Sequence, residues 1–206
     1  MNILICGAGA IGSNLAALLA CDLKGEHEII VLDKDNVEER NVQAGTQFYQ
    51  KDQVGMSKVE ALQYNIYKWY EREVKIINKE ISHENLRIIL ESGKTINVVD
   101  SYDLIIDCLD NYDARSLVQN HWEQLHKKLN ILHLGFSDQF TFAIEWAENY
   151  KVPTDITSGF DICEMEGAAS FVKMVASLGS LVTQEFIKDG KKREFLGNKF
   201  SIREVK

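Results

Sequence analysis

Apolar and polar positions alternate along the chain with two different periods. Short apolar runs of four to six residues, typical of buried strands, are separated by longer segments whose apolar residues have helical spacing. The pattern predicts strands over residues 2–6, 29–32, 74–77, 104–107, 131–134 and 141–146. It predicts helices over residues 11–23, 58–70, 114–128 and 167–188. This alternation indicates an α/β fold: a mostly parallel sheet with helices on both faces and antiparallel strands near the C-terminal end.

The segment from about residue 148 to residue 166 separates the last predicted strand from the last predicted helix. It contains the single proline together with Thr, Gly and acidic residues, and this composition predicts a crossing loop. Residues 150–162 within it are also a candidate clamp for the flexible tail of a partner. A chain of 206 residues without repeats or low-complexity tracts is expected to fold as a single domain over residues 1–206.

Composition and charge argue against several classes of function. The chain is 45% hydrophobic and 26% charged, as in soluble globular proteins, and its net charge of −8 argues against a nucleic-acid partner. No stretch approaches the roughly 18 uninterrupted apolar residues of a membrane span, and no basic leader precedes the first apolar run, so we expect neither a membrane contact nor a signal peptide. The four cysteines lie far apart without a C-x-x-C pair, which predicts reduced thiols, a cytoplasmic location and no zinc.

A glycine-rich hexapeptide marks a turn of the nucleotide-binding type. The sequence G-A-G-A-I-G over residues 7–12 follows the first predicted strand and opens the first predicted helix. Glycines in such a turn allow a tight backbone, close approach to a phosphate and close packing of helix on strand, and the helix N-terminus attracts the anion. Asp33 ends the second strand 21 residues after Gly12, where its carboxylate can accept hydrogen bonds from a ribose. The motif alone is compatible with NAD, FAD or another nucleotide.

A lysine and a second carboxylate further along the chain favour phosphate chemistry over hydride transfer. A lysine such as Lys58 can neutralise charge that develops on a leaving pyrophosphate, and a carboxylate such as Asp110 can hold Mg²⁺ together with phosphate oxygens. Because ligands of open α/β sheets bind at the carboxyl ends of the strands, we expect Asp33 and Asp110 at the same edge. A hydride-transfer enzyme has no need for this lysine and carboxylate, so an NAD-dependent oxidoreductase is the weaker alternative.

Together these segments resemble the family of ThiF, MoeB and ubiquitin-activating enzymes. The matching segments are, in chain order, GAGAIG (7–12), DKDNVE (33–38), Asn41, VGMSK (54–58), DCLDNYDAR (107–115) and, more weakly, CEMEG (163–167), LGSL (178–181) and Glu185. The resemblance implies a Rossmann-like fold and an adenylyltransferase that uses ATP and Mg²⁺. Its substrate would be the C-terminal carboxylate of a small ubiquitin-like or sulfur-carrier protein with a Gly-Gly tail. The resemblance also implies a homodimer.

The resemblance implies roles for individual residues. Gly7, Gly9 and Gly12 would cradle the nucleotide, and Asp33 would hold the ribose. Asp35, Asn41 and Lys58 would face the phosphates, and Asp110 would bind Mg²⁺. The implied nucleotide-binding set is Gly7, Ala8, Gly9, Ala10, Ile11, Gly12, Asp33, Asp35, Asn41, Lys58, Leu109 and Asn111. The catalytic candidates are Lys58, Asp110, Arg40 and Cys163, whereas Arg115 has either a structural or a binding role.

One departure from the family pattern concerns an arginine that contacts the phosphates. Family members usually carry N-[LI]-x-R-Q, whereas residues 41–47 here are N-V-Q-A-G-T-Q, and no arginine lies between Arg40 and Arg72. A charge-stabilising arginine can be worth about 10³–10⁵ in the rate of phosphoryl transfer. Either Arg40 or an arginine of a partner subunit supplies the charge, since Gln47 offers only a neutral hydrogen bond, or the protein is a non-catalytic module that binds a nucleotide or a partner.

Several other side chains have more than one interpretation. Cys163 is either the acceptor of the activated acyl group or sulfur, as the resemblance implies, or a small buried hydrophobic residue. Cys6 and Cys108 are expected in the core. His27, His83, His121, His126 and His133 lack metal-ligand spacing and are expected at the solvated surface. Tyr64, Tyr67, Trp69 and Tyr70 are expected on a core or subunit-interface face of one helix.

Overall fold

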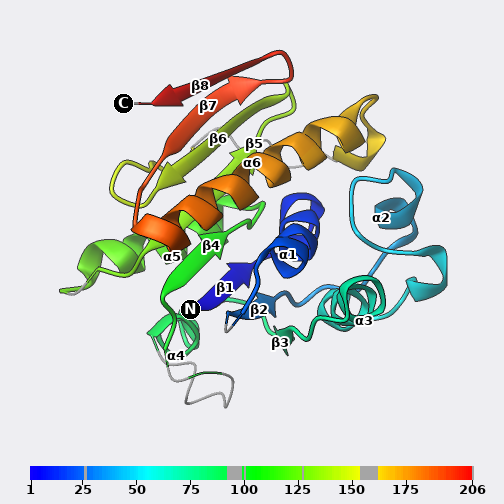
Figure 1. The fold of residues 1–206 in the computed structure, drawn as a ribbon, viewed down its shortest axis with the longest axis horizontal. Helices are drawn as coiled ribbons and strands as arrows, with labels where there is room; N and C mark the ends of the chain where they lie inside the picture. Colours follow the sequence, from blue (N-terminus) through cyan, green and yellow to red (C-terminus); the bar gives the residue numbers. More distant parts are fainter. Residues whose placement is uncertain (26, 92–98, 100, 127, 154–161, 206) are drawn as a thin grey trace.

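The described part of the chain forms one mixed sheet of eight strands in the order β3-β2-β1-β4-β5-β6-β7-β8 (Figure 1). The computed structural model describes the chain apart from residues 26, 92–98, 100, 127, 154–161 and 206. The strands are β1 Asn2–Cys6, β2 Glu28–Leu32, β3 Lys75–Ile77, β4 Leu104–Asp107, β5 Ile131–Phe136, β6 Thr141–Trp146, β7 Glu194–Asn198 and β8 Ser201–Val205. β1 to β5 pair in parallel, and β5 to β8 pair antiparallel. The predicted fold class is therefore confirmed.

Helices cover both faces of this sheet. They are α1 Ala10–Asp22, α2 Glu39–Gln43, α3 Lys58–Tyr70, α4 Leu86–Glu91, α5 Tyr112–Gln124 and α6 Ala168–Asp189, with 3₁₀ turns at Lys51–Gln53 and Ile162–Glu164. Successive side chains of a strand point to opposite faces. Accordingly Ile3 and Ile5 of β1 pack in the cluster with α1, α3 and α6, and Leu4 and Cys6 pack in the cluster with α4 and α5. α1 and α6 lie next to each other on the face of the sheet to which Ile3 and Ile5 point (Figure 1).

Helix boundaries differ from the predicted ones where capping decides them. The helix predicted over residues 114–128 begins at Tyr112, because the Asn111 side chain accepts the N–H of Ala114 at 2.8 Å and caps the helix. It ends at Gln124, because Leu125 adopts an extended conformation. The pattern does not predict α2 and α4, which are too short to show a helical period.

One prediction about exposure is wrong, and one of the two alternatives in another is excluded. His133 is 1% exposed, because it lies on β5, an inner strand with β4 and β6 on either side. The aromatic residues of α3 are not core residues: Tyr64, Tyr67 and Trp69 are 56%, 57% and 63% exposed, since the helix buries its opposite face. Their placement in a subunit interface stays a prediction.

The crossing segment joins β6 to α6. The described part of the predicted loop, about residues 148–166, contains the 3₁₀ turn at Ile162–Glu164. Most of the predicted clamp over residues 150–162 lies outside the described residues.

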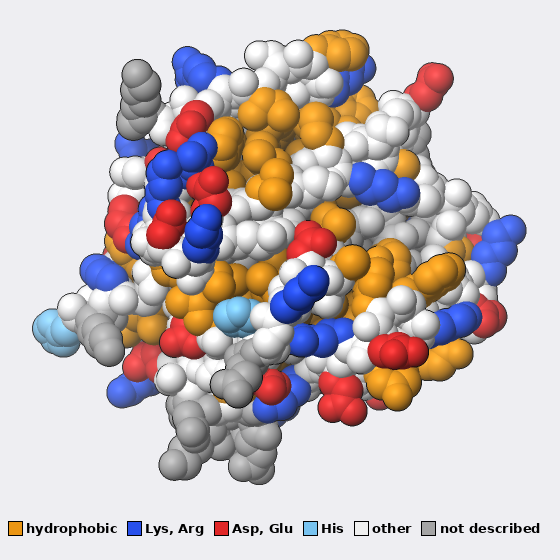
Figure 2. Space-filling model, in the orientation of Figure 1, with side chains coloured by type: hydrophobic (Ala, Val, Ile, Leu, Met, Phe, Trp, Pro, Cys, Tyr) orange, Lys and Arg blue, Asp and Glu red, His pale blue; other side chains and the backbone are white. Residues whose placement is uncertain are grey.

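The surface mixes charges of both signs. On the face shown in Figure 2, lysine and arginine side chains are interspersed with acidic ones. Among the described residues, no helix combines the length and the apolar character needed to cross a membrane.

The carboxyl ends of β1, β2 and β4 lie side by side. Cys6 is in register with Leu32 of β2 and with Asp107 of β4. The residues that follow these strands, Gly7, Asp33 and Cys108, therefore meet at one edge of the sheet. This is the edge at which open α/β sheets bind their ligands.

Candidate functional site

The glycine loop between β1 and α1 is shaped by close backbone contacts. Gly7 has a φ of +95°, and a Cβ there would lie 2.8 Å from the carbonyl oxygen of Cys108. A Cβ on Gly12 would lie 1.9 Å from the carbonyl oxygen of Gly7. A Cβ on Gly9 would meet no atom within 4 Å. The first and third glycines are thus required by packing, and the second leaves the backbone open to a ligand.

Two polar side chains hold this loop in place. Asp33 Oδ2 accepts the N–H of Ala8 at 2.6 Å, and the Tyr49 hydroxyl donates to the carbonyl oxygen of Ala8 at 2.6 Å. Burial, reinforced by Asp33 and Asp35, raises the pKa of Tyr49 well above its ordinary value, so the hydroxyl remains a donor. The role of Tyr49 is not predictable from the sequence, because no local motif marks a contact between residues that lie 41 positions apart.

Lys58 lies next to two carboxylates beyond the end of β2. Its Nζ lies 3.2 Å from Asp35 Oδ2, and its side chain is only 11% exposed. Burial raises the pKa of Asp33, and the nearby Lys58 ammonium opposes this shift. Asp33 Oδ1 also accepts the N–H of Asp35 at 2.8 Å, which leaves lone pairs on both carboxylate oxygens for ribose hydroxyls. The structure therefore brings these three residues to the glycine loop, and their roles toward a nucleotide stay predictions.

The loop that follows β4 carries the predicted magnesium ligand. Asp110 is exposed and comes three residues after the end of β4, at the same edge as the glycine loop. No three His, Cys, Asp or Glu side chains are grouped to hold a metal ion in the part of the chain that the structure describes. Mg²⁺ fits such a place, because it binds through one or two carboxylates together with phosphate oxygens and water. Asp110 is the residue that would hold it.

Residues 41–47, which contain no arginine, begin within the short helix α2. Asn41 is buried, and its Oδ1 accepts the N–H of Glu38 at 2.8 Å, so its side chain caps this helix. Arg40 forms an ion pair with Glu38, and its side chain is 58% exposed. Asn41 therefore has a structural function whatever it contributes to phosphate binding, and Arg40 lies at the surface.

Cys163 lies near the start of α1. Its Sγ is 3.3 Å from Thr46 Oγ1 and 3.8 Å from Gln47 Nε2. The residue is half-buried and packs, like Ala10 of α1, against a small apolar cluster that includes Ile162. This position is compatible with either interpretation of the thiol.

The two other cysteines near the site are core residues, as predicted. Cys6 and Cys108 are buried, and burial raises the pKa of both thiols, so they stay protonated.

A buried polar network lies behind the loop that carries Asp110. Asp107 is fully buried; its Oδ2 lies 2.7 Å from His133 Nδ1, and its Oδ1 accepts the N–H of Leu109 at 2.9 Å. Desolvation would raise the pKa of Asp107, but Arg115 and His133 outweigh it and lower the pKa. Arg115 is 6% exposed and donates to the Tyr150 hydroxyl at 3.0 Å. Of its two interpretations, the structural role agrees with this burial.

We expect acidification from about pH 7.5 to about pH 5.5 to lower the free energy of unfolding, because burial lowers the pKa of His133 and the unfolded chain takes up the proton more readily. The stabilising contribution is complete above the unfolded pKa of about 6.5 and is lost as the pH falls toward the lowered folded pKa. Chemical denaturation of the wild type and of His133→Gln at the two pH values measures this loss of stability. The pKa of His27 is also lowered, but this contribution is present in both proteins and cancels in the comparison. Equal losses in the two proteins contradict the prediction.

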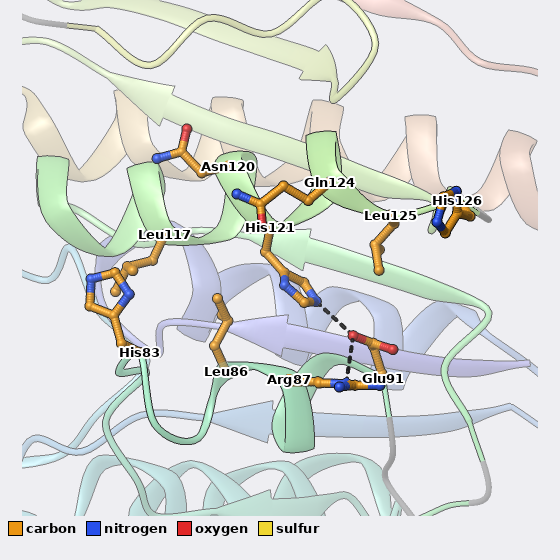
Figure 3. A pocket seen from close by; sticks show the side chains of 10 residues that line it. All are labelled: His83, Leu86, Arg87, Glu91, Leu117, Asn120, His121, Gln124, Leu125 and His126. Atoms are coloured by element: carbon orange, nitrogen blue, oxygen red, sulfur yellow. Dashed lines mark ion pairs between the residues drawn. The ribbon is translucent and has the colours of Figure 1, made fainter.

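A separate hollow of about 720 Å³ lies between α4 and α5 (Figure 3). Its lining residues are His83, Leu86, Arg87, Glu91, Leu117, Asn120, His121, Gln124, Leu125 and His126. Glu91 Oε1 lies 3.0 Å from His121 Nε2 and 3.5 Å from Arg87 Nε. The contact between Glu91 and His121 connects the two helices, whereas the pair of Arg87 and Glu91 lies within α4. None of the lining residues belongs to the predicted nucleotide-binding set.

The sheet topology and the edge geometry define a Rossmann-like α/β domain with a glycine turn of the nucleotide-binding type. The profile of the ThiF family matches residues 1–203, and the chain belongs to this family. The resemblance inferred from the motifs is thereby confirmed.

Similar proteins agree with this membership. Adenylyltransferase and sulfurtransferase MOCS3 of Caenorhabditis briggsae is 29% identical over 118 residues, which cover 57% of this chain and 27% of that protein. Ubiquitin-like modifier-activating enzyme 5 of Drosophila ananassae is 30% identical over 149 residues, which cover 65% of this chain and 33% of that protein. The chain thus spans about a third or less of the length of these relatives.

Solved structures show the same fold. E. coli MccB, in a crystal structure with AMPCPP and MccA, has a TM-score of 0.75 and 18% identity, with coverage of 99% of this chain and 63% of MccB. PaaA has a TM-score of 0.67 and 19% identity, with coverage of 100% and 63%. At these identities the likeness concerns the fold alone.

Proposed function

We propose that this protein uses ATP and Mg²⁺ to adenylate the C-terminal carboxylate of a small carrier protein. The observation that carries the proposal is the position of Lys58, whose ammonium stands beside Asp35 and close to Asp33 at the edge of the sheet that holds the glycine loop. β1 lies between β2 and β4, so Lys58 and Asp110 flank the loop from opposite sides. A triphosphate over the loop would meet a cation on one side and a metal-binding carboxylate on the other.

In the proposed reaction a carboxylate oxygen of the carrier attacks the α-phosphorus of ATP. The bond between that phosphorus and the oxygen bridging to the β-phosphate breaks, which yields an acyl-adenylate and pyrophosphate. Backbone N–H groups at the start of α1 attract the phosphates, and Lys58 neutralises charge on the leaving pyrophosphate. Asp33 accepts hydrogen bonds from the ribose. Bound Mg²⁺ would supply Lewis-acid neutralisation of the phosphate oxygens, with Asp110 as its protein ligand.

The proposed partner is a ubiquitin-like or sulfur-carrier protein with a Gly-Gly tail, met in the cytoplasm by a homodimer of this chain. Support comes from the names of relatives, which include a sulfurtransferase and ubiquitin-like modifier-activating enzymes. MccB has been crystallised with ATP and with MccA.

A second candidate function is a non-catalytic module that binds the nucleotide or the partner. It is favoured by the segment of residues 41–47, which contains no arginine, and by Arg40, which is exposed and paired with Glu38. In the catalytic alternative, Arg40 leaves this pair for the phosphates, or an arginine of a partner subunit completes the site.

Carrier-dependent exchange of labelled pyrophosphate into ATP tests the proposal, and mass spectrometry detects the acyl-adenylate. Exchange with a Gly-Gly carrier supports adenylation. Binding of Mg·ATP without exchange, even with the carrier present, supports the non-catalytic module. Thermal stabilisation by NAD but not by Mg·ATP favours the oxidoreductase.

Transfer of the acyl group to Cys163 is the proposed second step. The thiol loses its proton to solvent, the thiolate attacks the acyl carbon, and AMP leaves as the thioester forms. We expect Cys163→Ser to abolish the thiol-sensitive carrier adduct while the acyl-adenylate still forms, as measured by intact-protein mass spectrometry. The exposed Cys21 provides the matched control, Cys21→Ser. An adduct that survives Cys163→Ser contradicts the transfer.

A further inference from the structure

Both residues that flank Asp110 are held by hydrogen bonds. The N–H of Leu109 donates to Asp107 Oδ1 at 2.9 Å, and its carbonyl oxygen accepts Nε of Arg115 at 2.5 Å. On the other side, Asn111 Oδ1 accepts the N–H of Ala114 at 2.8 Å. The exposed Asp110 thus lies between two residues that hydrogen bonds hold, Leu109 through its backbone and Asn111 through its side chain.

Arg115 connects this loop to two other elements. Its Nη2 donates to the carbonyl oxygen of Leu134 on β5 at 2.6 Å, and its Nη1 donates to the hydroxyl of Tyr150, at the start of the crossing segment, at 3.0 Å. Gly135 makes room for the guanidinium, since a Cβ there would lie 3.1 Å from Nη2. The planar fork of an arginine reaches three acceptors in fixed directions, which a lysine ammonium on a flexible stem cannot do.

The residues around the guanidinium also contact one another. Tyr150 stacks on His133 with ring centroids 3.7 Å apart and planes 9° apart, and His133 in turn contacts Asp107. Asp107 Oδ2 lies 3.9 Å from Arg115 Nη1, so the buried cation has a buried counter-charge. A buried ion pair contributes little net stability compared with apolar packing, whereas removal of one partner leaves the other charge buried and uncompensated.

The loop also abuts the glycine turn. The N–H of Cys108 donates to the carbonyl oxygen of Cys6 at 2.8 Å, and the carbonyl oxygen of Cys108 occupies the space where a side chain on Gly7 would point. A displacement of residues 108–111 would therefore change the surface on which a phosphate is proposed to lie.

We propose that Arg115 is a positioning residue that fixes residues 108–111 against the glycine turn, so that Asp110 is set for a phosphate-bound Mg²⁺, and that it couples this loop to the crossing segment through Tyr150. The part of this inference that concerns Mg²⁺ rests on the proposed function. The part that concerns the loop does not.

Amide hydrogen exchange of the full chain without ligand tests the loop. In Arg115→Lys, the segment of residues 108–114 exchanges roughly tenfold faster or more, and β1 stays protected. Arg72→Lys is the matched control, because Arg72 also donates to two backbone carbonyl oxygens, those of Gly25 and His27 at 3.2 and 2.6 Å, away from the loop. Unchanged exchange of residues 108–114 in folded Arg115→Lys overturns the proposal.

Tyr150→Phe keeps the ring and removes only the hydroxyl, so it decides the question if Arg115→Lys does not fold. It accelerates exchange of residues 108–114 by about threefold, as expected for the loss of one hydrogen bond. Wild-type exchange in this variant overturns the coupling to Tyr150.

Binding of a fluorescent ATP analogue tests the link to the metal. For each protein the affinity is measured in EDTA and again with Mg²⁺; the gain in affinity on adding Mg²⁺ is reduced by about tenfold in Arg115→Lys and unchanged in Arg72→Lys. An undiminished gain overturns the link. A wild type that binds no nucleotide, with a loop that loosens in Arg115→Lys, refutes the proposed function and leaves the positioning role supported.

Discussion

Replacing Lys58 with methionine is expected to lower carrier-dependent pyrophosphate exchange by about 10²–10³-fold, the usual effect of removing one group that stabilises developing charge. Methionine keeps most of the length and the apolar stem while it removes the ammonium. The ion pair with Asp35 is partly exposed, since Asp35 is 52% exposed, so its loss changes the free energy of unfolding by no more than about 1 kcal/mol. Exchange kinetics and chemical denaturation measure the two effects.

The control for this substitution lies on the same helix. Lys68→Met removes an exposed ammonium that lies 5.8 Å from the ring centroid of Tyr64, at the other end of α3. It is expected to leave exchange within about twofold of the wild type, as for a surface change remote from the site. If Lys58→Met exchanges pyrophosphate at the wild-type rate, the lysine does not act on the phosphates and the catalytic proposal loses its main support.

Substitutions at two glycines of the loop are expected to have different effects: one lowers the stability of the fold, and the other weakens nucleotide binding. Gly12→Ala places a methyl group 1.9 Å from the carbonyl oxygen of Gly7, which belongs to the backbone and cannot rotate away. We expect a loss of about 3 kcal/mol or more of stability, as for severe overpacking. Gly9→Ala points its methyl group into open space, where it meets no atom within 4 Å, so we expect it to lower the stability by no more than about 1 kcal/mol.

Gly9→Ala is expected to weaken ligand binding although it changes stability little. A methyl group on Gly9 would occupy the surface on which we expect a phosphate, so Gly9→Ala should weaken binding of a fluorescent ATP analogue by about tenfold or more while the protein stays folded. Titration of the analogue and thermal denaturation measure both quantities on one preparation. Wild-type affinity in Gly9→Ala shows that the ligand does not approach the loop at this residue.

Long elements were predictable because their pattern is local and repeats many times. The helix predicted over residues 167–188 is observed as Ala168–Asp189, and its apolar face packs against α1. The helix predicted over residues 58–70 is α3. By contrast, α2 spans five residues and α4 six, which is less than two turns. Their formation depends on capping and on tertiary contacts, as the cap by Asn41 illustrates.

Part of the candidate site was predictable because its residues follow strands in short motifs. Gly7, Asp33 and Asp110 each come within three residues of a strand end, and parallel strands place those ends together. The supports of the site were not predictable: Tyr49 reaches the glycine loop from another segment, and His133 was expected at the surface. A polar residue in the middle of an inner strand carries no local signal of the buried partner that satisfies it.

Fold class, family membership and the residues that follow the strands are readable from the amino-acid sequence, because they depend on hydrophobic period and on motifs of a few neighbouring positions. Which of those residues are exposed and which are buried depends on tertiary packing. Packing leaves Asp110 at the surface and buries Arg115, only five positions later, in the network with Asp107, His133 and Tyr150. A buried charge is tolerated only where partners satisfy it, and here those partners include residues from distant segments.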